Sequence, residues 1–136
     1  MSDLTLTRTL GASPERVWRA WTTDELVAWL WPSSWAATCE IDLRVGGRFR
    51  ISSSTVDTGA GGEYTVVEAI TRLQHTWLWE GDEKETLVTL TFEPVDGGTL
   101  LTIVHENFAD DATRDDHLQG WGDCVDRLPG FLASDQ

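Results

Sequence analysis

The feature that most constrains the fold is an apolar stripe near the C-terminus, within residues 116–132 (DHLQGWGDCVDRLPGFL). On an α-helix with 3.6 residues per turn, apolar residues at steps of three or four share one side. Such a helix is stable only when another part of the chain covers that side. The stripe consists of Leu118, Trp121, Val125, Leu128 and Leu132.

Most of the chain before this helix, from Glu40 to Glu106, alternates apolar and polar residues as antiparallel strands do. Including one strand near the start, the predicted strands are 4–10, 36–43, 48–53, 63–70, 73–80, 85–93 and 99–106. Residues 54–62 (STVDTGAGG) are polar and glycine-rich and predict a mobile loop. Residues 96–98 (DGG) predict a hairpin between the last two strands.

Two short helices are expected between the first strand and the rest of the sheet. Ser13 is placed to cap a helix whose first residue is Pro14, where a missing N–H is tolerated. Thr22 and Glu25 have the spacing of a capping box for a second short helix, which Pro32 ends. Pro129 predicts a bend or a break in the C-terminal helix.

These elements predict one domain, residues 1–136, of the α+β class. A curved antiparallel sheet of about six or seven strands wraps around the long C-terminal helix, and the two short helices close one end. A sheet that curls around a single helix tends to leave a cavity against its concave face, where small ligands bind. We expect this cavity near Trp121, because the small Gly120 and Gly122 flank that ring.

The charge of the chain excludes some partners. The formal net charge is −13, and all of the excess lies after Val56, because residues 1–56 hold six acidic residues and six arginines. Such a chain has no basic surface for a phosphate backbone, so nucleic acid is not an expected partner. No apolar run is long enough for a membrane span and the N-terminus does not resemble a signal peptide, so we expect a cytoplasmic protein.

Tryptophan is the first candidate for a functional role, with eight residues in 136. Trp77 and Trp79 share a strand face with His75 and are expected to face Trp121. These rings either pack the core or form an aromatic wall for a flat apolar ligand. Trp31 and Trp35 follow the short helices and are candidates for the mouth of the cavity; if exposed, they favour a homodimer interface.

Two histidines belong to the same predicted face. His105 follows Leu101 and Ile103 at the end of a strand, where it is a satisfied core residue, a polar group that orients a ligand, or a general base. A general base needs a partner within reach, and the sequence offers Asp42, Tyr64 or Glu68 for this role. His75 either adds polarity to the cavity or lies at its wet edge, and the edge is favoured.

No metal site and no cofactor are expected. His117 and Cys124 share a helical face, but two ligands do not close a site, and Cys39 and Cys124 are expected to be free thiols. No nucleophile motif or phosphate loop is present, so no catalytic residue is assigned. The ligand-binding candidates are Trp31, Phe49, Ile51, Tyr64, His75, Trp77, Trp79, Leu90, Ile103, His105, Leu118 and Trp121.

Several segments resemble the START-like superfamily of polyketide-cyclase, lipid-transfer and pollen-allergen-like proteins. The branch they resemble is named after activators of the heat-shock-protein ATPase. The similar segments are SPERVWRAWT at 13–22, 29–32, DLRVGGRF at 42–49, Leu73 with Thr76 and Trp77, 98–106, and Gly120 with Trp121. The resemblance implies the helix-grip fold and a ligand-sized pocket, but no catalytic set; the histidine at position 75 departs from the apolar residue common there.

Three functions are therefore compared. The first is a binding module for a small apolar or aromatic molecule held between sheet and helix. The second is a cyclase- or hydrolase-like enzyme that uses His105 with an acid in the pocket. The third is a protein that interacts with a chaperone through its acidic surface, and it ranks last.

Overall fold

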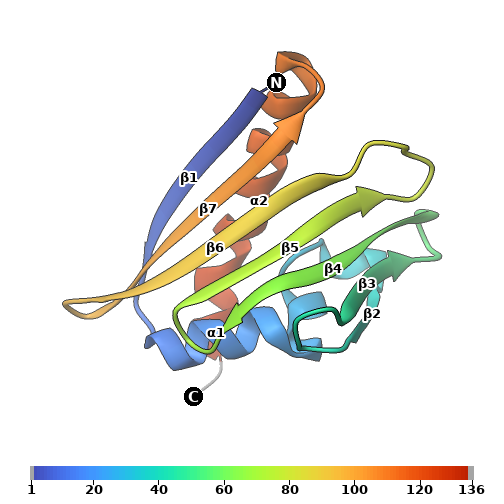
Figure 1. The fold of residues 1–136 in the computed structure, drawn as a ribbon. Coiled ribbons are helices and arrows are strands. Elements are labelled where there is room, and N and C mark those ends of the chain that lie inside the picture. Colours follow the sequence, from blue (N-terminus) through green and yellow to red (C-terminus); the bar gives the residue numbers. More distant parts are fainter. Residues whose placement is uncertain (1, 135–136) are drawn as a thin grey trace.

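The computed structural model describes the backbone of residues 2–134 and the side chains of residues 2–133. One antiparallel sheet has the strand order β1-β7-β6-β5-β4-β3-β2 (Figure 1). Its strands are β1 (Ser2–Leu10), β2 (Thr38–Ile41), β3 (Arg48–Ser53), β4 (Thr58–Glu68), β5 (Arg72–Trp79), β6 (Thr86–Val95) and β7 (Gly98–Phe108). The helices are α1 (Pro14–Thr22), the 3-10 helices η1 (Asp24–Ala28) and η2 (Ser33–Trp35), and α2 (Asp111–Ser134).

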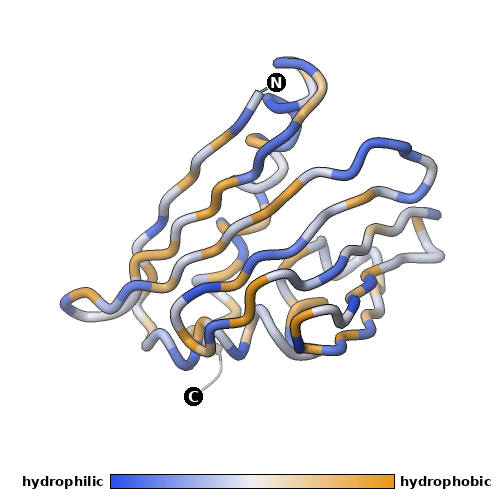
Figure 2. Tube along the Cα trace, in the orientation of Figure 1, coloured by the Kyte–Doolittle hydropathy of each residue, from blue (hydrophilic) through white to orange (hydrophobic). Residues whose placement is uncertain are grey.

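The predicted α+β class is confirmed, with seven strands, short helices after the first strand and one long C-terminal helix. Helix α2 lies along one face of the sheet, behind the strands in the view of Figure 1, and α1 lies across the end of that face. The strands alternate in hydropathy along their length, as the tube in Figure 2 shows. The apolar side of each strand therefore faces the helices and forms the core.

Helix α1 begins where the sequence predicts, because the Ser13 hydroxyl accepts the backbone N–H of Arg16 over 3.2 Å. The predicted capping box at Thr22 is wrong by one residue. Thr22 is still the last residue of α1, and its hydroxyl donates to the Trp18 carbonyl over 2.8 Å. Thr23 instead caps η1 by accepting the N–H of Glu25 over 3.3 Å.

The mobile loop predicted at residues 54–62 is wrong, because only 54–57 form a turn and β4 begins at Thr58. The glycines that suggested a loop are needed for close backbone packing within the sheet. A Cβ on Gly62 would lie 1.9 Å from the Thr76 carbonyl oxygen, and a Cβ on Gly61 would lie 2.7 Å from the Phe49 carbonyl oxygen. Glycine is therefore required at these two positions because neighbouring strands leave no room for a side chain.

The predicted strand 36–43 is shorter in the structure, where β2 is Thr38–Ile41. Ala36 has a left-handed backbone with φ 49° and ends η2, so a strand cannot begin there. The C-terminal helix is longer than predicted, because the Asp110 carboxylate accepts the N–H of Thr113 over 2.7 Å and α2 starts at Asp111. The helix is continuous through Pro129, so the predicted break is wrong.

The core lies between the inner face of β6 and β7 and the stripe of α2. Leu90 and Ile103 are direct cross-strand partners, and both are buried. From α2, Trp121, Val125, Leu128 and Leu132 are buried in the same hydrophobic cluster. These side chains form the core between sheet and helix.

Leu118 is 38% exposed, so the predicted stripe is wrong at its first member. At 100° per residue, Leu118 lies about 60° to the side of Trp121, whereas His117 lies only about 40° from that ring on the other side. His117 therefore takes the inward position in this turn.

Candidate functional site

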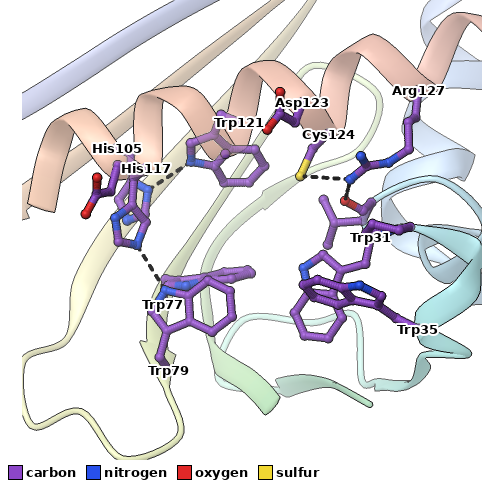
Figure 3. A pocket seen from close by; sticks show the side chains of 14 residues that line it. Trp31, Trp35, Trp77, Trp79, His105, His117, Trp121, Asp123, Cys124 and Arg127 are labelled. Atoms are coloured by element: carbon purple, nitrogen blue, oxygen red, sulfur yellow. Dashed lines mark hydrogen bonds between the residues drawn. The ribbon is translucent and has the colours of Figure 1, made fainter. Parts of the chain in front are cut away.

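A cavity of about 380 Å³ lies between β5, α2 and the segment that follows η1 (Figure 3). This volume is at the lower end of the roughly 300–1,000 Å³ common for small-molecule sites. The described residues that line the cavity are Leu30, Trp31, Pro32, Trp35, Trp77, Trp79, His105, Asp116, His117, Gly120, Trp121, Asp123, Cys124 and Arg127.

Five of the residues that line the cavity are tryptophans. The rings of Trp31 and Trp79 stack at 6.0 Å with an interplanar angle of 7°, and Trp35 lies 5.2 Å from Trp31. Trp77 contacts the edge of Trp79 at 5.3 Å and lies 6.1 Å from Trp121. Trp31 is only 5% exposed because it packs inward against Trp79, so the exposure that would favour a homodimer interface is not found at this residue. The rings belong to the core and line open space at the same time.

A hydrogen bond between β5 and α2 fixes the orientation of Trp79. Its indole Nε1–H donates to Nε2 of His117 over 2.9 Å. The other nitrogen of His117, Nδ1, lies 2.8 Å from the Thr113 carbonyl oxygen one turn earlier in α2. An indole is only a donor, so Nε2 of His117 is the acceptor and Nδ1 carries the proton. The Trp79 side of the cavity wall is thus connected to α2 by a hydrogen bond in which Trp79 is the donor and His117 the acceptor.

A second chain of hydrogen bonds connects three residues that line the cavity, Trp121, His105 and Trp77, through Thr86. Trp121 Nε1–H donates to Nδ1 of His105 over 3.0 Å. His105 Nε2 lies 2.6 Å from the hydroxyl oxygen of Thr86, and that hydroxyl lies 3.2 Å from the Trp77 carbonyl oxygen. Because Trp121 can only donate, His105 carries its proton on Nε2 and donates to Thr86. Every member of this chain has a partner.

His105 is a neutral imidazole. Burial, together with the nearby His117 and His75, lowers its pKa to about 3. Within the described part of the chain, its hydrogen-bond partners are Thr86 and Trp121 rather than the predicted Asp42, Tyr64 or Glu68. Both ring nitrogens are engaged, so neither is free to take a proton from a ligand. The geometry fits a fixed polar group better than a general base.

His75 is buried, so the predicted wet edge is wrong: the aromatic rings of Phe49, Tyr64 and Trp77 surround it. Burial lowers the pKa of His75 to about 4, and its Nδ1 lies 2.8 Å from the Thr76 carbonyl oxygen. Burial, together with Cys39 and Asp42, raises the pKa of the Tyr64 hydroxyl.

Phe49, Tyr64 and His75 border a separate space of only about 10 Å³. Leu30, Trp77 and Trp121 line both this small space and the main cavity. These three side chains therefore lie between the two spaces.

The predicted candidates thus fall into four groups. Trp31, Trp77, Trp79, His105 and Trp121 meet at the main cavity. Phe49, Tyr64 and His75 border the small inner space. Ile51, Leu90 and Ile103 are core residues with at most 1% exposure, and Leu118 faces solvent.

The flank of α2 that faces the cavity could be predicted from the sequence only at Gly120, next to Trp121. Asp116, Gly120, Asp123, Cys124 and Arg127 recur at steps of one, three or four residues, so they share one strip beside the apolar stripe. The helical period contained this signal, but polar residues beside an apolar stripe usually face solvent. Only the position of β5 and of the segment after η1 shows that this flank borders a cavity.

In the part of the chain that the structure describes, no group of three or more histidine, cysteine, aspartate or glutamate side chains is arranged to hold a metal ion. None of the helices in residues 2–134 is long and apolar enough to span a bilayer. Cys39 and Cys124 are free thiols, and burial raises the pKa of Cys124 to about 11.

Comparison with known proteins places this chain in a family. Residues 11–133 match the family model described as activator of Hsp90 ATPase homolog 1-like protein. The chain belongs to this family. No curated protein matches the chain.

Solved structures of similar proteins share the whole fold of this family member. A protein from Rhodobacter sphaeroides is 30% identical with a TM-score of 0.84, covering 99% of this chain and 95% of that chain. A protein from Chromobacterium violaceum is 27% identical with a TM-score of 0.80, covering 96% of both chains. An Hsp90 activator from Plasmodium falciparum is 20% identical with a TM-score of 0.80, covering 98% and 97%, and at this identity the likeness concerns the fold alone.

Proposed function

We propose that this protein binds a small apolar or aromatic molecule in the cavity between β5 and α2. The observation that carries the proposal is an aromatic wall that is held in place yet leaves about 380 Å³ unfilled. The N–H groups of Trp79 and Trp121 are already bonded to His117 and His105. The wall therefore presents ring faces and edges to the cavity, which suits a flat apolar ligand.

The rigidity of the wall supports binding over simple core packing. A side chain held by a hydrogen bond and by stacking loses little freedom when a ligand arrives, and this lowers the entropic cost of association. Trp79 has both restraints, from His117 and from the ring of Trp31. A core that merely packed poorly would be expected to let these rings turn inward and fill the space.

Titration with naphthalene tests this proposal, with intrinsic tryptophan fluorescence as the readout. We expect saturable quenching or a spectral shift in the natural protein, and at least a severalfold weaker response in Trp79→Leu. Trp18→Phe is the matched control, because Trp18 packs against Phe92 at 5.3 Å and is not part of the cavity lining. If a broad set of one- to three-ring compounds leaves the fluorescence unchanged, the binding proposal is wrong.

A chaperone-linked role is the second candidate, favoured by the family description and by the Hsp90 activator from Plasmodium falciparum among the structural neighbours. The excess negative charge after Val56 would attract a basic surface, and salt would weaken such an attraction. The test is the ATPase turnover of purified Hsp90 with and without the protein at two salt concentrations. Equal turnover in all conditions excludes this role.

A further inference from the structure

Arg127 differs from the other arginines in how its charge is compensated. Eight of the nine arginines have a carboxylate oxygen within 4.0 Å. Among the described residues, Arg127 is the one arginine without such a partner, in a chain whose net charge is −13. It is also the one arginine that lines the aromatic cavity.

The guanidinium of Arg127 is held firmly by the backbone. Its Nε–H donates to the Trp29 carbonyl over 2.9 Å, and one Nη2–H donates to the Leu30 carbonyl over 2.7 Å. These two bonds occupy one edge of the planar group and leave the opposite edge, formed by Nη1 and the second Nη2–H. The only other described contact of that edge is the Cys124 sulfur at 3.8 Å.

None of these contacts neutralises the positive charge. Two carbonyl oxygens are dipoles, and Cys124 is a neutral thiol because burial raises its pKa. Figure 3 shows the guanidinium beside Cys124 at the edge of the cavity, above Trp31. A half-buried arginine with a free edge is well suited to bind a carboxylate or a similar planar anion in two parallel hydrogen bonds.

We propose that Arg127 recognises an anionic group, a carboxylate or sulfonate, on the aromatic molecule that the cavity binds. This inference rests on the proposed function and specifies the ligand class. Two acids also line the cavity, but Asp116 and Asp123 are both exposed, and water and salt screen exposed charges. Asp123 already accepts an N–H of Gln119 over 3.0 Å, and Asp116 lies eleven residues from Arg127, about 16 Å along the helix.

Three naphthalene derivatives of nearly equal size test the inference: 2-naphthoate, 2-naphthamide and 2-naphthylmethylammonium. Their dissociation constants are measured by isothermal calorimetry on the full chain. We expect 2-naphthoate to bind about 10- to 100-fold more tightly than 2-naphthamide, as charge-assisted hydrogen bonds predict. The ammonium compound is expected to bind most weakly.

Arg127→Gln should remove the preference for 2-naphthoate and change the affinity for 2-naphthamide less than about threefold. Because the readout is a ratio of two affinities, a general loosening of the segment after η1 would move both and leave the ratio unchanged. Arg127→Lys keeps the charge and should retain part of the preference. Arg114→Gln is the control, since Arg114 lies on the same helix, pairs with Asp115 and is outside the cavity lining.

The outcomes separate the two proposals. If 2-naphthamide binds and 2-naphthoate binds no better, or if Arg127→Gln leaves the ratio unchanged, the anion inference is wrong while the binding function stands. If none of the three compounds binds and the wider set of aromatic compounds also fails, both proposals are wrong.

Discussion

The indole N–H of Trp121 donates to Nδ1 of His105 over 3.0 Å, and this bond joins the long helix to the inner face of the sheet. It fixes the tautomer of a buried histidine and, through Thr86, reaches the backbone of β5. In contrast, the Nε1–H of Trp77 is buried without a hydrogen-bond partner in the described structure. Trp121 and Trp77 are thus nearly equally buried, but only Trp121 has a hydrogen-bond partner for its indole N–H among the described residues.

This difference predicts unequal effects of the same substitution at the two sites. Trp121→Phe leaves Nδ1 of His105 without a donor, whereas Trp77→Phe removes an N–H that had no partner. Both lose similar apolar volume, so we expect Trp121→Phe to lower the free energy of unfolding by about 1–3 kcal/mol more than Trp77→Phe. Urea denaturation monitored by far-UV circular dichroism measures both; equal losses would show that the bond to His105 contributes nothing.

The buried histidines predict a dependence of stability on pH. Burial lowers the pKa of His75 to about 4 and that of His105 to about 3, against about 6.5 in the unfolded chain. Between pH 4 and 6 the unfolded chain therefore binds more protons than the folded one. The contribution of these two histidines to the free energy of unfolding is fully present above about pH 6.5. It is lost as the pH falls toward their folded-state pKa values.

Near pH 5 the two groups together should contribute a slope of roughly 2 to 3 kcal/mol per pH unit in the free energy of unfolding. His75→Phe should reduce this contribution by about half, since a phenyl ring cannot take up a proton. Urea titrations of both proteins from pH 4.5 to 7 give the slopes. The natural protein and the variant would have the same slope if His75 were already protonated in the folded state.

Sequence patterns were sufficient for most of the sheet, because strand faces follow a strict period of two. Residues 48–53 were predicted with their observed bounds, and the inward positions of Leu90 and Ile103 followed from alternation alone. The errors lie where tertiary contacts override local preference. The glycines at 59, 61 and 62 suggest a loop when the neighbouring strands cannot be seen.

The candidate site was predictable only in part for a related reason. The aromatic face of β5 and Trp121 could be brought together because each belongs to a regular element with one apolar side. His117 and Arg127 could not, since their roles depend on how α2 is rotated against the sheet. Leu118 and His117 lie about 60° and 40° to either side of Trp121, so a modest rotation of the helix decides which of them faces inward, and the apolar period does not define the rotation that finely.

The crowded glycine at position 62 gives a direct test of the corrected strand β4. A Cβ at Gly62 would overlap the Thr76 carbonyl, so Gly62→Ala should separate β4 from β5 and lower the free energy of unfolding by more than about 2 kcal/mol. Gly122→Ala is the matched control, because nothing lies within 4 Å of its Cβ and alanine favours a helix by about 1 kcal/mol. If residues 58–62 were a mobile loop, Gly62→Ala would be nearly neutral.

The bond between Trp79 and His117 predicts how far orientation of the aromatic wall matters for binding. His117→Phe keeps a ring of similar size on α2 but removes the acceptor for Trp79 Nε1–H, while the stacking of Trp79 on Trp31 remains. A neutral hydrogen bond contributes about 0.5–1.5 kcal/mol, so naphthalene should bind roughly 2- to 10-fold more weakly. Gln119→Ala, on the exposed side of the same helix, should leave the dissociation constant unchanged. Fluorescence titration of the three proteins decides: unchanged affinity in His117→Phe would mean that stacking on Trp31 alone holds the wall.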